Sequence, residues 1–343
     1  MNTQSKIRIL LTGASGTIGQ QILPRLWSRR NELFVTIFDV ETKHSKSIFK
    51  RYESDMTVVY GDIRDKASVQ KVGLNQDVVI HLAAIIPPLA DEKPKLTYQV
   101  NVEGTKNLIE ALESSDTKPF LIYASSVSVY GDRVKTPNIK VGDIIQPSAK
   151  DEYGVTKVKA EQLIQNSTLN WTIFRLSAIM GVNNHKISKL MFHMPLTTAL
   201  EITTPADAAR AFVHAIFKQN QLSKKIFNLG GGESCRTTYK FFLAESFKRF
   251  GLGTPNFPTK AFAEKNFHCG YYADGNKLEA ILKFRKDSML SYFQKVEENV
   301  SPLKKRLASW FHPIIKWYLL QLSEPYRAFK RKDKEAIRHF FEV

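Results

Sequence analysis

The stretch ILLTGASGTIG, residues 9–19, places three glycines between an apolar run and the start of a helical pattern. In a loop of this kind the first glycine, here Gly13, permits a tight turn. The second, Gly16, lets the backbone approach a pyrophosphate, and the third, Gly19, allows close packing of helix against sheet. The helix that follows presents free N–H groups to the phosphates. The stretch therefore predicts a dinucleotide-binding loop, in which we expect Thr17 and Ile18 to contact the dinucleotide with the glycines.

A carboxylate at the end of the second apolar run supports this interpretation. Asp39 follows Gly19 by about 20 residues, the separation at which an acidic residue bonds the ribose hydroxyls of the adenosine. The same charge repels a 2′-phosphate, so Asp39 favours NAD(H) over NADP(H). Lys43 and His44 lie nearby and act against that preference.

Seven apolar runs rich in β-branched residues alternate with helical patterns. The runs are residues 7–12, 33–39, 57–60, 77–82, 119–124, 171–176 and 225–229, and the helical patterns are 17–30, 67–72, 96–114, 153–166 and 205–218. Continuous apolar runs suit strands buried on both faces of a parallel sheet. The alternation predicts an α/β fold with a doubly wound parallel sheet of the Rossmann type. We expect an NAD-binding domain at 1–170, the last strands and a small substrate-binding portion at 171–290, and a basic helical extension at 291–343.

The composition is that of a globular protein, with 43% hydrophobic and 24% charged residues in a chain of 343. Its two cysteines, Cys235 and Cys269, have no metal-ligand spacing and form no disulfide framework, which fits a reducing cytoplasm. The chain begins almost directly with a strand and has no apolar run of membrane-spanning length, so we expect neither a signal peptide nor a span. The net charge of +17 favours an anionic partner. No nucleic-acid motif accompanies it, so nucleic acid is not expected.

The segment DEYGVTKVKAEQL, residues 151–163, places Tyr153 and Lys157 one helical turn apart. Residues at i and i+4 share a helix face, so spacing alone is explained by an ordinary surface pair. Other landmarks decide between this explanation and a functional one. They are TGASGTIG (12–19), Asp39, GDIRD (61–65), HLAA (81–84), NVEGT (101–105), YASSVSVYG (123–131), YGVTK (153–157), FRLSAIMG (174–181) and ITTPADAARA (202–211).

With these landmarks in order, residues 6–285 resemble the extended short-chain dehydrogenases/reductases, the NAD-dependent epimerase/dehydratase family. The resemblance implies that Asp62 and Ile63 meet the adenine ring. It implies that Leu82, Ala83 and Ala84 line the cofactor at the end of the fourth strand. Asn101 matches a helix asparagine with a structural or water-holding role. Dimerisation through a four-helix interface is usual in the family, so a homodimer is expected.

The resemblance also implies the catalytic residues. Ser126, four residues before Tyr130, matches the active-site serine better than Ser125 does. Tyr153 would be the general acid/base, and Ser126 would hold the substrate oxygen. Because a free phenol has a pKa near 10, we expect Lys157 and a positive nicotinamide ring to lower it. Lys157 would also bond the nicotinamide ribose.

The substrate region departs from the nucleotide-sugar enzymes of the family. Those enzymes carry an asparagine where this chain has Ala178, and a longer segment with an arginine for the diphosphate where residues 182–206 contain no arginine. Lysine does not bind phosphate bidentately, so the usual clamp is missing. Ile85 and Ile86 after the HLAA landmark predict an apolar pocket wall, to which we add Ser126, Ser177 and Met180 as substrate contacts. Ordinary core packing is the better explanation for the wider group of Met180, Met191, Phe192 and Met194.

Three functions remain open. The first is an NAD-dependent dehydrogenase or reductase acting on a secondary alcohol or ketone. The second is a nucleotide-sugar epimerase with an altered substrate clamp, and the third is a non-catalytic NAD-binding or membrane-peripheral protein. His81, His185 and His193 have no ligand spacing, so no metal is expected.

The tail at 301–343 carries ten lysine or arginine residues against four acidic ones. Its apolar residues recur every three or four positions, which predicts an amphipathic helix with a kink at Pro313. They are Leu303, Leu307, Trp310, Phe311, Ile314, Ile315, Tyr318, Leu319 and Leu322. Packing on its own domain or at a dimer interface is the commonest cause of such a face, and we expect it here. Attachment of residues 301–334 to an anionic membrane is the alternative.

Overall fold

The computed structural model describes residues 6–182 and 189–342. Its centre is a seven-stranded sheet with the strand order β10-β7-β5-β4-β1-β2-β3, in which every neighbouring pair is parallel. The strands are β1 Ile7–Thr12, β2 Leu33–Asp39, β3 Thr57–Tyr60, β4 Val78–His81, β5 Phe120–Ser126, β7 Asn170–Leu176 and β10 Lys225–Leu229. All seven strands expected from the apolar runs are confirmed, and so is the doubly wound parallel sheet.

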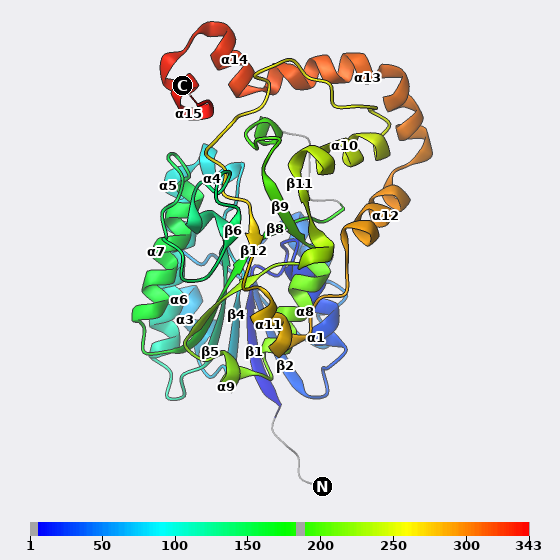
Figure 1. Ribbon diagram of the computed structural model, residues 1–343. Coiled ribbons are helices and arrows are strands. Elements are labelled where there is room, and N and C mark those ends of the chain that lie inside the picture. The colour runs from blue at the N-terminus through cyan, green and yellow to red at the C-terminus, as the bar shows by residue number, and fades with distance from the viewer. Residues whose placement is uncertain (1–5, 183–188, 343) are drawn as a thin grey trace.

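Helices cover both faces of this sheet, as Figure 1 shows, with α3, α6 and α7 on one side and α1, α8 and α11 on the other. Apolar residues of the strands therefore point into two clusters, one containing Ile9 and Ile80 and the other Leu10 and Val79. Burial on both faces explains why the strands read as continuous apolar runs. The helices of this part are α1 Gly19–Trp27, α2 Lys43–Phe49, α3 Lys66–Gly73, α4 Leu89–Glu92, α5 Pro94–Tyr98, α6 Gly104–Glu113, α7 Glu152–Asn166, α8 Pro205–Ala215, α9 Gln219–Leu222 and α11 Asn276–Leu282.

The helix expected over 96–114 is interrupted. A π-helical turn, Gln99–Glu103, separates α5 from α6. Its Asn101 is buried with its side chain turned to the neighbouring loop, and Gly104 follows against Ile63, where a Cβ would lie 2.6 Å from that side chain. The π turn places Asn101 inward, which a regular 3.6-residue period does not predict.

The C-terminal portion has a separate apolar core above the carboxyl ends of the strands. This core includes Phe192, Leu200, Phe242 and Phe262, and α12 contributes Phe293 to it. Two small sheets accompany it, with the orders β11-β9-β8 and β12-β6. The elements are β6 Asn138–Ile139, β8 Ala178–Ile179, β9 Ala199–Thr203, β11 Arg236–Thr238, β12 Tyr271–Tyr272, α10 Tyr239–Arg249 and α12 Met289–Asn299. Helix α12 begins at Met289 and belongs to this core, so the core continues past the boundary expected at residue 290. That boundary stays a prediction.

The tail is helical, as expected, and has three helices: α13 Pro302–Leu322, α14 Glu324–Arg331 and α15 Lys334–Phe340. Figure 1 shows α13 crossing the end of the molecule opposite the N-terminus and bending along its length, which fits a helix with Pro313 inside it. α14 and α15 pack on the body, where they contribute Ala328 and Phe340 to a cluster with Ala263. The packing expected for the apolar face of α13 is confirmed only in part, because Ile315 and Leu319 face the body while most of the apolar stripe is exposed.

Candidate active site

The glycine loop joins β1 to α1 with a shape that only glycine permits. Gly13 has a φ of +71°, and a Cβ on it would lie 2.6 Å from the Ala83 nitrogen. A Cβ at Gly19 would lie 2.6 Å from Ala14, so α1 starts in direct contact with the loop. The backbone N–H groups of Thr17, Ile18 and Gly19 have no acceptor within the described residues. Three free donors at a helix N-terminus form a site for an anion, so the loop fits a dinucleotide pyrophosphate.

Asp39 lies at the end of β2 beside this loop. Its Oδ2 accepts the Ser15 N–H at 2.7 Å, and its Oδ1 accepts the Val40 N–H at 2.8 Å. The carboxylate is therefore held in place with lone pairs left for ribose hydroxyls. Lys43 and His44 lie exposed at the start of α2.

The adenine contacts implied by the resemblance follow β3. Asp62 is partly exposed and accepts hydrogen bonds from the Arg64 guanidinium, which holds the pKa of the carboxyl below its usual range. Ile63 is buried, and its carbonyl accepts from Asn107. The contact of Asp62 and Ile63 with adenine stays a prediction.

A directed chain of hydrogen bonds shapes the end of β4. The Thr105 hydroxyl donates to the Asn101 carbonyl at 2.7 Å, so its oxygen accepts from Nε2 of His81 at 3.0 Å. Nδ1 of His81 then accepts from the Thr12 hydroxyl at 2.7 Å, and the Thr12 oxygen accepts from the Ala83 N–H at 3.3 Å. Burial lowers the pKa of His81 to about 3, with a smaller contribution from Lys157. His81 is therefore neutral and structural, as expected.

Asn101 fixes the loop after β4. Its Oδ1 accepts the Ile85 N–H at 2.8 Å, and its Nδ2 donates to the Ile85 carbonyl at 2.9 Å and to the Thr156 hydroxyl at 3.1 Å. Thr156 lies on α7 and donates to the carbonyl of Tyr153. The expected structural role of Asn101 is confirmed, because it links the predicted pocket wall to the helix of the predicted acid/base. Ile86, next in the chain, is 58% exposed and free to contact a ligand.

The two candidate serines at the end of β5 have different surroundings. The Ser125 hydroxyl donates to Glu161 at 2.5 Å and is fully buried. The Ser126 oxygen accepts from the N–H of Ser128 at 3.2 Å, and its hydroxyl is near enough to Tyr153 to lower the pKa of that phenol. Ser126 is thus the serine that meets Tyr153, which supports the choice made from the sequence.

Tyr153 and Lys157 lie on the first two turns of α7, which Asp151 caps by accepting the Gly154 N–H at 2.7 Å. The Lys157 ammonium lies 5.7 Å from the Tyr153 ring centroid. It donates to the Ala124 carbonyl at 2.7 Å and to the Tyr123 hydroxyl at 3.2 Å. Lys157 is buried, so the surface-pair explanation is wrong. Tyr123 was not predicted as a site residue, although it opens the landmark that contains both serines.

The expected lowering of the Tyr153 pKa is not produced by the chain's own groups. Burial raises that pKa well above its ordinary value, and the hydrogen bond from Ser126 opposes burial only in part. Burial also lowers the pKa of Lys157 to about 7, while Glu161 acts in the opposite direction. Desolvation disfavours the charged form of each group, so it outweighs their mutual attraction.

The other predicted substrate contacts are less open. The Ser177 hydroxyl lies 2.8 Å from that of Thr203 and is buried. Met180, Phe192 and Met194 belong to the C-terminal core, which confirms the packing role of this group. Contact of Ser177 or Met180 with a substrate stays a prediction. His185 lies outside the described residues.

A buried ion pair lies next to Ser125, whose hydroxyl donates to the acid of the pair. Arg175 on β7 donates to Glu161 on α7 at 2.7 and 3.0 Å, and both side chains are almost fully buried. Arg175 also donates to the Tyr130 hydroxyl at 2.9 Å, which donates in turn to Asn228 on β10 at 2.7 Å. Together with the hydrogen bond from Ser125 to Glu161, these contacts join β5, β7 and β10 to α7 around the two serines.

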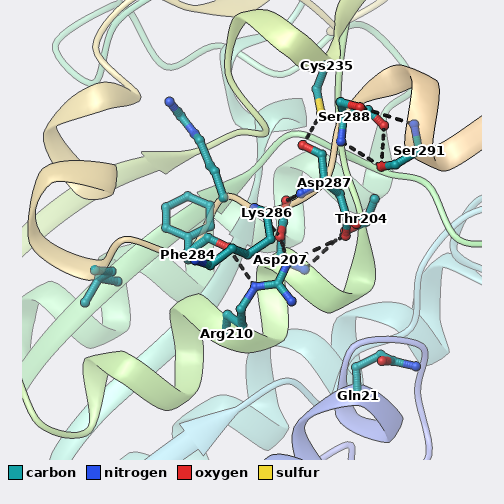
Figure 2. A network of polar contacts seen from close by, with 12 residues as sticks. Gln21, Thr204, Asp207, Arg210, Cys235, Phe284, Lys286, Asp287, Ser288 and Ser291 are labelled. Carbon is teal, nitrogen blue, oxygen red and sulfur yellow. Dashed lines mark hydrogen bonds and ion pairs between the residues drawn. The ribbon is translucent and has the colours of Figure 1, made fainter.

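Figure 2 shows a second polar network, at the start of α8, which gives the landmark at 202–211 a structural role. Thr204 caps α8 by accepting the Asp207 N–H at 3.1 Å and donates to Asp287 at 2.5 Å. Asp207 accepts the N–H groups of Lys286 and Asp287 at 3.0 and 3.1 Å and pairs with Arg210. An open cavity of about 460 Å³ lies beside this network, and no predicted site residue lines it.

Among the described residues, no cluster of His, Cys, Asp and Glu is arranged to hold a metal ion. Both cysteines are buried and unpaired. No described helix is long and apolar enough to span a bilayer.

Comparison with known proteins agrees with this geometry. The sequence model of the NAD dependent epimerase/dehydratase family matches residues 9–230. The chain belongs to this family, and its cofactor is NAD.

Individual relatives divide between two activities. Mouse 3 beta-hydroxysteroid dehydrogenase type 7 is 30% identical over 159 residues, which are 45% of this chain and 43% of the relative. UDP-glucuronate 4-epimerase 2 of Arabidopsis thaliana is 29% identical over 48% of this chain and 39% of its own length. The matched region therefore spans less than half of each of these relatives.

Among solved structures, UDP-glucuronic acid 4-epimerase from Bacillus cereus, in complex with UDP-glucuronic acid and NAD, has the same fold. Its TM-score is 0.67 at 22% identity, over 85% of this chain and 99% of the epimerase.

Proposed function

We propose that this protein is an NAD-dependent oxidoreductase that moves hydride between the nicotinamide and the carbon of a secondary alcohol or ketone. The observation that carries the proposal is the meeting of Ser126, Tyr153 and Lys157 at the carboxyl end of β5. The glycine loop opens at the carboxyl end of β1, and the carboxyl ends of parallel strands lie at one edge of the sheet. The N–H groups that would bind a pyrophosphate and the phenol of Tyr153 therefore lie at the same edge of the sheet.

The residues have distinct tasks. Bound NAD supplies the hydride acceptor and, when oxidised, a positive charge that favours the phenolate of Tyr153. Because its pKa is raised, Tyr153 is a phenol at neutral pH, and in the reductive direction it gives its proton to the oxygen that becomes basic as hydride reaches the carbonyl carbon. In the oxidative direction Tyr153 accepts the proton of the substrate hydroxyl. Ser126 bonds the same oxygen and orients it, and Lys157 is fixed by the Ala124 carbonyl with donors left for ribose hydroxyls.

An apolar substrate fits the surroundings of this site. The exposed Ile86 side chain follows Ile85, whose backbone is held by Asn101. The relatives include 3 beta-hydroxysteroid dehydrogenases, so an alcohol or ketone on a largely hydrocarbon frame is the substrate class we propose.

A nucleotide-sugar 4-epimerase is the second candidate, because epimerases are among the relatives and share the fold. The described part of the clamp segment argues against it. Lys189 donates to Glu324 at 3.0 Å, so its charge is already paired. Lys186 lies outside the described residues.

The fate of NAD separates the two candidates. The freshly purified protein is denatured, and the supernatant is assayed for NAD. An oxidoreductase that exchanges its cofactor in each cycle should release little NAD, and NADH added to the native protein should bind reversibly. A sterol alcohol should then give NADH with the wild type. Near-stoichiometric released NAD, with turnover of UDP-glucuronic acid and no net NADH, would contradict the proposal in favour of the epimerase.

Homodimerisation and a cytoplasmic location stay predictions. Sedimentation over a range of concentrations would test the homodimer.

A further inference from the structure

The outer face of α13 is a continuous apolar surface on which none of the described residues packs. Seven large side chains are exposed: Leu303, Leu307, Trp310, Phe311, Ile314, Trp317 and Tyr318. At 100° per residue they occupy a stripe of roughly 120° along a helix about 30 Å long. Trp310, Ile314 and Trp317 are each more than 60% exposed. Contiguous exposed apolar surface of this kind marks a site of interaction.

The opposite face holds the helix on the molecule. Ala308, Ile315, Leu319 and Leu322 pack against the C-terminal core. Lys316 donates to the Thr254 carbonyl at 3.0 Å and to Asn256 at 2.9 Å. The inner face therefore explains the folding of α13 and leaves the outer stripe unexplained.

The charges beside the stripe are all positive. The helix contains Lys304, Lys305, Arg306 and Lys316 and no acidic residue. Lys305 pairs with Glu297 at 3.0 Å, while Lys304 and Arg306 are exposed and have no ion-pair partner among the described residues. On a helical wheel these two cations flank the stripe on opposite sides. The surface thus combines an apolar stripe with unpaired cations on both edges.

A groove of about 380 Å³ lies along one side of the helix, between α10, α12 and α13. Its wall is mostly apolar, with Leu252, Val296 and Ala308, and Lys304 and Lys305 also line it. An amphiphile with an anionic head group matches this arrangement of apolar wall and ammonium groups.

We propose that α13 docks in the plane of an anionic phospholipid bilayer. Trp310, Trp317 and Tyr318 are amphipathic aromatic side chains of the type enriched at bilayer interfaces. The flanking cations complement the anionic head groups, and a helix that is amphipathic rather than apolar all round lies on a membrane instead of crossing it. A second copy of the chain is a poorer partner. A two-fold interface through this stripe would place the flanking cations of both copies at its edges, with no acidic residue on either α13 helix to pair with them.

Vesicle flotation tests the proposal on the full chain at low salt. The protein should float with vesicles of phosphatidylcholine and phosphatidylserine, and much less with phosphatidylcholine alone. Neutralising both cations, as K304Q with R306Q, should lower the partition coefficient roughly 30-fold. Replacing the apolar centre, as W310S with F311S, should abolish flotation. The emission of Trp310 and Trp317 should shift to shorter wavelength with anionic vesicles.

Matched controls remove the same charge or apolar surface elsewhere. K218Q with K277Q neutralises two exposed lysines outside the tail, and I144S removes a side chain that is 81% exposed. Both controls should float like the wild type. Absence of flotation, equal flotation with neutral vesicles, or equal loss in the controls would overturn the proposal. A concentration-dependent dimer that W310S with F311S dissociates would assign the stripe to a second copy. None of these results depends on the activity.

Discussion

Burial decides the chemistry of the residues at the centre of the site. Tyr153 and Lys157 share a helix face, and desolvation moves their pKa values in opposite directions, each toward the neutral form. The Tyr153 phenol has a raised pKa, and the Lys157 ammonium beside it has a pKa of about 7. The positive charge of an oxidised nicotinamide would lower the pKa of the phenol and make its proton easier to remove. Proton removal from the substrate in the oxidative direction should therefore depend on the oxidised cofactor, because the chain's own groups leave Tyr153 protonated.

The substitution Tyr153→Phe should lower kcat by about 10²- to 10⁴-fold, because it removes the proton carrier and little volume. NADH affinity, measured by fluorescence titration, should stay near that of the wild type. Tyr98→Phe removes a hydroxyl from a half-exposed tyrosine on α5 and should leave kcat unchanged. Unimpaired turnover by the Tyr153 variant would mean that another group carries the proton.

The substitution Asp39→Asn should shift the preference between cofactors. The amide oxygen can still accept the Ser15 N–H, but the charge that repels a 2′-phosphate is gone. We expect the ratio of NADPH to NADH affinity to rise about 10-fold or more. Asp65→Asn removes a carboxylate of the same charge from the cap of α3 and is the control. An unchanged ratio for Asp39→Asn would contradict the assignment.

The elements add constraints that no single residue explains. The β1–α1 loop combines a positive φ at Gly13, contact of Gly13 with Ala83 and free N–H groups at the start of α1. The first two features are requirements of folding, while the third is a requirement of binding.

Variants of two glycines should separate these requirements. Gly13→Ala should lower the free energy of unfolding by ~1–3 kcal/mol, because the side chain meets the Ala83 backbone at a positive φ. Gly16 has no positive φ, and its Cβ would meet only the Gly13 carbonyl, at 3.3 Å. Gly16→Ala should therefore unfold near the wild-type denaturant concentration and still lose NADH affinity. Wild-type affinity in Gly16→Ala would show that the pyrophosphate binds elsewhere.

At the scale of the whole molecule, ion pairs attach the tail to the body. Glu324 at the start of α14 pairs with Lys189 at 3.0 Å and His193 at 2.8 Å. Farther along, Glu335 pairs with Lys150. The tail therefore contacts Lys189 and His193, in the described part of the segment 182–206.

The tail contact should weaken in acid. The proximity of His193 and Lys189, whose nitrogens lie 2.8 and 3.0 Å from the carboxylate, lowers the pKa of Glu324 to about 2, from an ordinary value of 4.5. A carboxyl with a lowered pKa stabilises the folded state above its unfolded pKa, and the contribution is lost as the pH falls from 4.5 toward 2.

Replacement of Glu324 tests this linkage. Because the pair is partly exposed, Glu324→Gln should cost at most about 1 kcal/mol at neutral pH and nothing at pH 2, by denaturant unfolding. Glu342→Gln breaks the fully exposed pair with Lys135 and should cause no measurable change. A cost for Glu324→Gln that persists at pH 2 would rule out an ionic origin.

The sequence by itself determined the sheet, the cofactor loop and the candidate residues. The seven strands were predictable because strands buried on both faces are apolar throughout, and Gly13 and Asp39 because their spacing follows from local chain geometry. Ser126 and Tyr153 were found through landmarks within short segments of chain.

Only the tertiary structure decided what depends on contacts between distant segments. Asn101 is turned to Ile85 by a π turn that helical periodicity does not encode, and Lys157 is buried against β5 although lysine side chains usually lie at the surface. The apolar stripe of α13 was visible in the sequence, but which of its residues face the body could not be read from it. Periodicity reports that one helix face is apolar, whereas the partner of that face depends on packing between parts of the chain that are far apart in sequence.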